Sequence, residues 1–122
     1  MEELGATLLA VAGLLHLPPV AGVLGSRTIE RLYGVTVDQP SIAILLRHRS
    51  VLFGLIGALL IAAVWSDSLR PAAIAGAFIS DVTFLAVTGD PRRLDHMMRR
   101  VAIVDIASIV LLVTATALLL AA

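Results

Sequence analysis

The chain has 122 residues, of which 59% are hydrophobic and only 15% charged, and its formal net charge is zero. With a mean hydropathy of +1.00, this composition excludes an ordinary soluble domain, which is about half apolar and about one quarter charged. The balanced charge argues against a nucleic-acid partner. There is no cysteine and all nine basic residues are arginine, which excludes disulfide, thiol, iron–sulfur and lysine chemistry. We expect residues 1–122 to form a single integral membrane domain.

The first apolar segment, residues 4–24, is long enough to cross a bilayer as a helix. It follows acidic residues, whereas a signal peptide starts with basic ones, so we expect a retained membrane helix. Two prolines, at positions 18 and 19, cannot donate hydrogen bonds to the carbonyl groups four residues earlier. We therefore expect a kinked continuation. Because freed carbonyls at membrane depth need a polar neighbour, the stretch from His16 to Pro19 is a candidate pocket wall.

A polar stretch, residues 25–40, follows and contains a short helical pattern. Ser26 is the expected N-cap of a helix from Thr28 to Tyr33, and Gly34 is its expected stop. Apolar and charged side chains fall on opposite faces of this helix, which predicts that it lies on the membrane surface.

The second membrane span covers residues 42–65. An Arg-His-Arg triplet, residues 47–49, stands near its start, and Trp65 stands at its far end, where interfacial aromatic residues belong. Charge inside hydrocarbon is costly, so the triplet must lie at a membrane boundary or in a polar pocket.

Two further spans cover residues 71–88 and 101–120. The charged residues 92–100 between them are either a connector or the first turns of the next helix. Asp81 lies near the middle of the third span, and Asp105 lies one turn into the fourth. The pattern predicts an all-α fold: a four-transmembrane-helix bundle with a short amphipathic surface helix between helices 1 and 2.

The arginines predict the orientation. Eight of them flank the first and third connectors, and only Arg70 stands near the second connector. The positive-inside rule then places those two connectors in the cytoplasm and both termini outside. So strong a bias also argues against the dual-topology transporters of similar length.

In this orientation every span brings an ionisable group into the cytoplasmic half of the bilayer. Intramembrane ionisable residues usually serve function. The candidate catalytic residues are Asp81, His16 and Asp105. The candidate ligand-binding residues are Arg47, His48, Arg49, His16, Asp81, Asp105, Glu30 and Tyr33. No histidine pair has metal-ligand spacing on one helix, so we expect no metal site.

Several details stay open. Successive residues differ by about 100° around a helix, so the pocket-facing arginine is either Arg47, on the face of Ser50, or Arg49, on the face of Phe53. We expect one arginine to pair with Asp81 or Asp105. The structural alternatives are membrane anchoring for the triplet, a packing hydrogen bond for His16, and orientation of the surface helix for Glu30 and Tyr33. For Asp105 the structural alternative is a helix-end ion pair with Arg99, Arg100 or Arg47.

Several sequence segments resemble the DoxX-like group of small bacterial four-helix membrane proteins. They are GLLHLPPVAGVLG, RLYGV, DQP and ILLRHRSVLFGLIGALL. The resemblance covers most of the chain and implies a location in the bacterial cytoplasmic (inner) membrane. It also implies quinone-linked or redox functions, membrane partner complexes, and a fold similar to that of isomerases of sterol-like lipids. Similar uncharacterised proteins often carry the name phosphopantetheine adenylyltransferase, but the chain has neither the HxGH motif nor the parallel-sheet pattern of that soluble enzyme.

Three functions remain in view. The first is a pocket that binds or transforms a lipophilic small molecule, such as a quinone, isoprenoid or sterol-like lipid; a cavity near Asp81 that opens towards lipid would favour it. The second is an accessory or structural subunit, as a homodimer or in a membrane complex, which a filled core with every charge paired would favour. The third is a small proton-coupled transporter, which a water path from both sides would favour. No cofactor motif is evident, although a quinone would fit the first function.

Overall fold

The computed structural model describes residues 1–122, except for the side chain of Pro91. The described residues form helices and no strand, which confirms the predicted all-α fold. Four segments are long and apolar enough to cross a membrane, and they indicate a multi-pass membrane protein. The elements are α1 (Glu2–Leu15), η1 (Pro18–Leu24), α2 (Ser26–Tyr33), α3 (Pro40–Ala62), η2 (Asp67–Leu69), α4 (Arg70–Thr88), η3 (Pro91–Arg93) and α5 (His96–Ala121).

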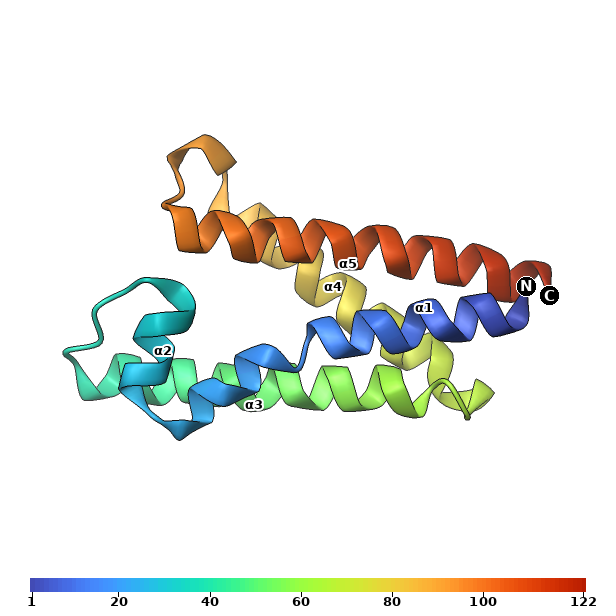
Figure 1. The fold of residues 1–122 in the computed structure, drawn as a ribbon, viewed down its shortest axis with the longest axis horizontal. Helices are drawn as coiled ribbons and strands as arrows, with labels where there is room; N and C mark the ends of the chain where they lie inside the picture. Colours follow the sequence, from blue (N-terminus) through green and yellow to red (C-terminus); the bar gives the residue numbers. More distant parts are fainter.

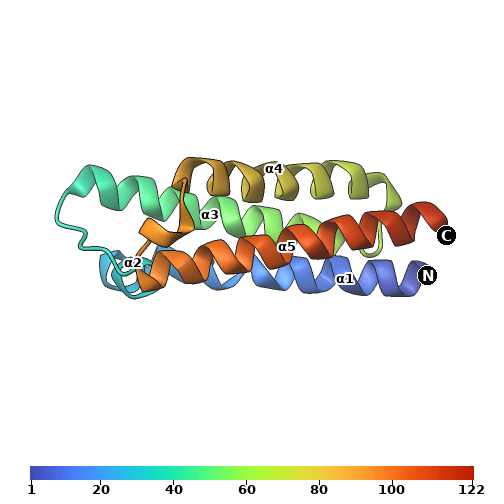
Figure 2. The same cartoon turned by 90° about the horizontal axis from the view of Figure 1, so that it is seen from above.

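The four long helices form one closed bundle (Figures 1 and 2). Each packs against the next in the chain, and α5 packs back against α1. Successive long helices run in opposite directions, so the N- and C-termini lie at the same end (Figure 1). The short helix α2 and the connector between α4 and α5 lie at the other end.

The first membrane segment changes helix type instead of bending as an α-helix. The α-helix ends at Leu15, and the chain continues from Pro18 as the 3₁₀ helix η1. The carbonyl of Leu14, which Pro18 deprives of its α-helical donor, accepts a bond of 3.3 Å from the amide of Leu17. The expected continuation past the prolines therefore exists, in 3₁₀ form.

Small residues allow the helices to approach closely. Gly13 of α1 and Gly57 of α3 face each other, and a Cβ atom on Gly57 would lie 2.9 Å from the carbonyl oxygen of Gly13. The buried apolar core lies on the side of the termini and is rich in alanine. It consists of Leu9, Ala12, Leu60, Ala63, Ala73, Ala77, Leu112 and Ala115.

Helix α2 begins at Ser26, two residues before the predicted start, and its N-cap is Gly25. The prediction that Ser26 is the cap was therefore wrong. The predicted stop at Gly34 is confirmed, because this residue has the left-handed φ of 65° that glycine adopts readily. Ile29 and Tyr33 are buried while the α2 arginines are exposed, as an amphipathic surface helix requires.

Residues 96–100 form the first turns of α5, which is one of the two alternatives predicted for this stretch. Helix α5 already begins at His96, and the Asp95 Oδ1 caps it by accepting a bond of 2.8 Å from the amide of Met98. Within the connector, Asp90 accepts hydrogen bonds from the side chain and backbone of Arg92, and these bonds lower the pKa of Asp90.

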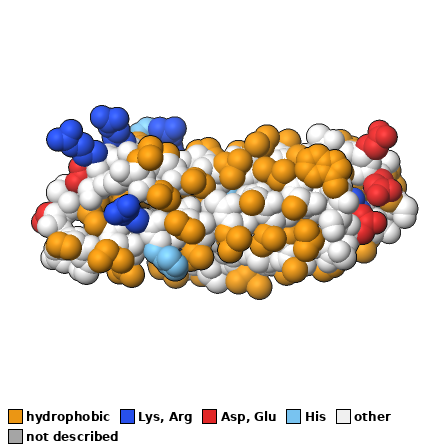
Figure 3. Space-filling view, turned by 90° about the horizontal axis from the view of Figure 1, so that it is seen from below, with side chains coloured by type: hydrophobic (Ala, Val, Ile, Leu, Met, Phe, Trp, Pro, Cys, Tyr) orange, Lys and Arg blue, Asp and Glu red, His pale blue; other side chains and the backbone are white. Residues whose placement is uncertain are grey.

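The two ends of the bundle differ in charge. Arginines gather at the end that carries α2, whereas the end with the termini shows mainly acidic side chains (Figure 3). The one arginine at that end, Arg70, forms ion pairs with acidic side chains and hydrogen bonds with backbone carbonyls. It pairs with Asp67 at 2.8 Å and with Glu2 at 3.6 Å, and it donates to the carbonyls of Ala63 and Val64.

Candidate functional site

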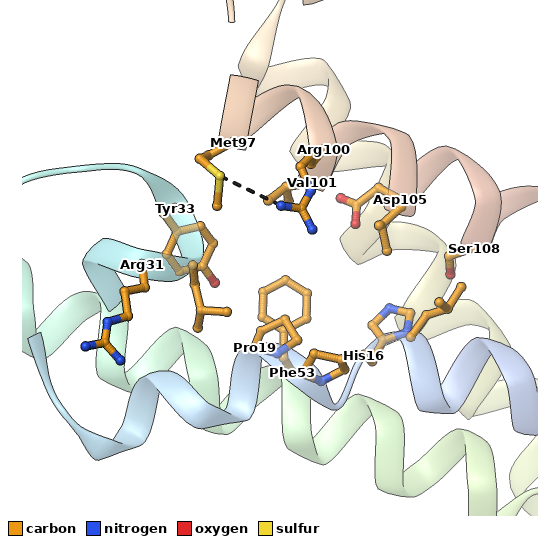
Figure 4. Close-up of a pocket in the computed structure, with 14 residues that line it drawn as sticks. His16, Pro19, Arg31, Tyr33, Phe53, Met97, Arg100, Val101, Asp105 and Ser108 are labelled. Carbon is orange, nitrogen blue, oxygen red and sulfur yellow. Dashed lines mark hydrogen bonds between the residues drawn. The ribbon is translucent and has the colours of Figure 1, made fainter. Parts of the chain in front are cut away.

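A cavity of about 390 Å³ opens in the half of the bundle that carries α2. It lies where the chain turns from α1 into η1, and α2 and α5 supply the facing walls (Figure 4). Most of the wall is apolar or aromatic. The lining residues are Leu15, His16, Pro18, Pro19, Arg31, Leu32, Tyr33, Phe53, Met97, Arg100, Val101, Val104, Asp105 and Ser108.

The break at the prolines helps to form this cavity. His16 is the C-cap of α1, and Pro18 and Pro19 begin η1. All three residues line the cavity, as the sequence predicted for this stretch. In Figure 1 the segment η1 diverges from α5, and α2 lies across the space between them.

His16 is buried and uses both ring nitrogens. Its Nδ1 lies 2.8 Å from the carbonyl oxygen of Ala12, and its Nε2 lies 3.1 Å from Oδ1 of Asp81. A carbonyl can only accept, so Nδ1 carries a proton. The contact between Nε2 and Oδ1 then holds one further proton, on the ring or on the carboxyl group. In either form the pair as a whole has no net charge.

Asp81 is fully buried and belongs to this pair. The expected arginine partner was wrong, because His16 reaches Asp81 across the interior from α1 to α4. The two helices are not among the principal packing pairs of the bundle, so the contact ties opposite sides of it together. The second oxygen of Asp81, Oδ2, is buried without a hydrogen-bond partner, and Asp81 does not line the cavity.

Asp105 lies on the cavity wall with 5% of its surface exposed. The expected ion pair with Arg99, Arg100 or Arg47 was wrong: among the described side chains no cation lies within salt-bridge distance of Asp105. Its Oδ2 is buried without a partner, and so is the hydroxyl of Ser108 one turn further along α5. His16, Asp81 and Arg49 are close enough to interact with Asp105 through their charge.

Of the two arginines in the triplet of α3, Arg49 is the one that faces inward, which is one of the two predicted alternatives. Arg47 and His48 are exposed, while Arg49 turns inward on the face of Phe53. Its guanidinium carbon lies 4.6 Å from the ring centre of Phe53 and 5.1 Å from that of Phe84. The Nη2 of Arg49 is buried without a hydrogen-bond partner. Arg49 thus places a positive charge beside the acids without pairing directly with either.

Two of the predicted site residues, Glu30 and Tyr33, belong to α2 and have different surroundings. Tyr33 lines the cavity, is 6% exposed, and has a buried hydroxyl without a partner. Glu30 lies outside the cavity wall and accepts a bond of 2.9 Å from the amide of Val37. Glu30 therefore holds the following loop against α2.

The structure brings His16, Tyr33 and Asp105 together at the cavity, and it places Arg47, His48, Arg49, Glu30 and Asp81 outside the cavity wall. Sequence reasoning did not propose Phe53, Arg100 or Ser108 as site residues. Ser108 carried a signal, because it lies three residues after Asp105 on the same helix face. Arg100 carried none, because nothing in the sequence distinguishes it from Arg99, the arginine beside it.

A second, mostly apolar hollow of about 790 Å³ lies between α4 and α5 near the termini. No residue lines both hollows. The fully buried Leu9, Ala12, Leu60 and Ala77 fill the core in the half with the termini.

No protein-family model, curated protein or solved structure matches the chain.

Proposed function

We propose that this is a bacterial inner-membrane protein that binds a lipophilic small molecule in the cavity beside α2. The molecule would be a quinone, an isoprenoid or a sterol-like lipid, held in the cytoplasmic half of the bilayer. The proposal includes membership of the DoxX-like group, supported by the sequence segments quoted above.

One observation carries the proposal. The cavity has apolar walls, and three buried polar atoms on its wall have no partner in the protein: the Tyr33 hydroxyl, Oδ2 of Asp105 and the Ser108 hydroxyl. Buried polar groups are nearly always hydrogen-bonded, because an unpaired group costs about 1–3 kcal/mol. Apolar pockets with a few convergent polar groups are the usual form of small-molecule sites.

The other two functions receive less support. An accessory subunit would have a filled core with each charge paired, whereas the buried Asp105 and the half-buried Arg49 have no ion-pair partner among the described residues. A transporter would need a path from both sides, whereas the two hollows share no lining residue.

The orientation follows from charge. The end with α2 carries eight of the nine arginines, and the positive-inside rule assigns it to the cytoplasm, with both termini outside. The single arginine at the other end is paired with Asp67 and Glu2, which leaves that end without an unpaired arginine.

The experiment compares two tryptophan variants of neighbouring residues. Val104 lines the cavity and Ile103 does not, and both are exposed enough to accept a larger side chain. Native mass spectrometry and lipid extraction of the purified wild type should identify a co-purifying hydrophobic molecule. Val104→Trp should lose this molecule and Ile103→Trp should retain it. The proposal fails if no molecule co-purifies, or if both variants retain it equally.

A further inference from the structure

The polar groups of the cavity lie at two levels along α5. Arg100 lies near the start of the helix, and Asp105 and Ser108 lie deeper in the membrane segment. At 1.5 Å per residue the backbone positions of Asp105 and Ser108 lie about 7.5 Å and about 12 Å from that of Arg100 along the helix axis. A ligand that uses both levels would carry one polar group for each.

The outer level offers hydrogen-bond donors. In Figure 4 the guanidinium of Arg100 points into the cavity, whereas that of Arg31 points away from it. The only hydrogen bond of the Arg100 guanidinium among the described residues is a weak one of 4.0 Å to the Met97 sulfur. The buried Tyr33 hydroxyl lies on the same wall and is also without a partner. A guanidinium fork fits a carboxylate, which accepts from it with two oxygens.

The inner level offers acceptors. Asp105 and Ser108 line the cavity, the Asp105 Oδ2 and the Ser108 hydroxyl are buried without a partner, and both nitrogens of His16 are already in use. A carboxylate at this level could only accept hydrogen bonds and could not donate one to Asp105. A hydroxyl group would instead donate to Asp105 and exchange a hydrogen bond with Ser108.

The charges of the site support this division. The pair of His16 and Asp81 has no net charge, and the guanidinium of Arg49 stacks on Phe53 and Phe84 outside the cavity wall. Arg100 remains as the cation that points into the cavity without an acidic partner among the described side chains. A ligand with a single negative charge would pair with it.

We propose that the ligand is an amphiphilic hydroxy acid. Its carboxylate pairs with Arg100 and accepts from Tyr33 at the membrane boundary, and its hydroxyl reaches Asp105 and Ser108 at the inner end. The inference rests on the proposed function and narrows it, because isoprenoid and sterol-like skeletons can carry both groups whereas a quinone carries no anion.

The experiment uses three probes of equal chain length: ω-hydroxydecanoic acid, decanoic acid and decanol. Their affinities are measured on the full-length protein in lipid nanodiscs by isothermal titration calorimetry. The hydroxy acid should bind about tenfold more tightly than either of the others, since one charge-assisted hydrogen bond contributes roughly this factor.

The variants assign each end of the probe. Arg100→Gln should abolish the preference over decanol, and Arg99→Gln is the matched control, because Arg99 is the neighbouring arginine and lies outside the cavity wall. Asp105→Leu should abolish the preference over decanoic acid. Ser108→Ala, a smaller change, should reduce the same preference and keeps this test available if Asp105→Leu does not fold.

Two results would overturn the inference. One is equal affinity of the wild type for all three probes, and the other is an equal loss of preference in Arg99→Gln and Arg100→Gln. Neither result touches the proposed function, which depends on co-purification and on the Val104→Trp variant. If no molecule co-purifies with the wild type and none of the three probes binds to it, both the proposed function and this inference are wrong.

Discussion

At the scale of single residues, the pair of His16 and Asp81 combines burial, charge and a link between two opposite helices. Replacing Asp81 by alanine leaves Nε2 of His16 buried without a partner, which should lower the free energy of unfolding by about 1–3 kcal/mol. Asp81→Asn keeps a hydrogen-bonding group in place and should cost less than half as much. Unfolding by dodecyl sulfate, followed by far-UV circular dichroism, measures both changes.

The same two variants separate two states of the pair. If Asp81→Asn destabilises the protein as much as Asp81→Ala, the hydrogen bond alone is not what stabilises the fold, and the charged form of the pair is required. Because Asp81 lies outside the cavity wall, Asp81→Asn should also retain the co-purifying molecule.

The sequence predicts which residues are unusual more reliably than it predicts their partners. His16, Asp81 and Asp105 stood out because ionisable groups are costly in a membrane, and the structure places the three near one another. Their partners depend on helix rotation, which a single span does not reveal. The half-buried Arg49 stacks on Phe53 and Phe84 instead of pairing with Asp81, and only the packing of α3 against α4 could show this.

At the scale of elements, the contact between α1 and α3 depends on two glycines. A Cβ atom on Gly57 would press against the backbone of Gly13, which cannot move without shifting α1. Gly57→Ala should therefore destabilise the protein by about 1–3 kcal/mol. It should also disturb the cavity, because the same Cβ would lie 3.3 Å from the Cβ of His16.

Gly76 of α4 provides the matched control. No atom lies within 4 Å of a Cβ placed on it, and alanine is a better helix former than glycine. Gly76→Ala should leave the protein unchanged or stabilise it by up to about 1 kcal/mol. Thermal unfolding of both variants in the same detergent tests the difference, and equal effects at the two positions would show that the close approach of α1 and α3 does not matter for stability.

The sequence also predicts the existence of the elements better than their ends. Apolar length alone located all four membrane segments, because the hydrocarbon core fixes the number of residues that a span needs. The apolar run of α5 starts at residue 101, and hydropathy left open whether the charged stretch before it belongs to the helix. In the structure the capping bond from Met98 to Asp95 begins the helix before the apolar run does. Local hydrogen bonding outweighs hydropathy at that boundary.

At the scale of the whole molecule, the distribution of charge predicts the orientation in the membrane. The absence of cysteine makes this prediction simple to test, since a single introduced cysteine is the only thiol. Thr36 lies in the exposed loop after α2, at the arginine-rich end, and Ser68 lies exposed in η2, at the end with the termini. The positive-inside rule places Thr36 in the cytoplasm and Ser68 outside.

The measurement is labelling of intact cells with a membrane-impermeant maleimide. Ser68→Cys should react at once, and Thr36→Cys should react only after the membrane is permeabilised. Reaction of Thr36→Cys alone in intact cells would reverse the orientation and place the cavity in the outer half of the bilayer. Equal reaction of both would indicate two populations, which the uneven distribution of arginines opposes. In that case Arg100 would lie at the cytoplasmic boundary in one population and at the outer boundary in the other. In a single population the hydroxy acid would reach Arg100 from the cytoplasmic boundary alone.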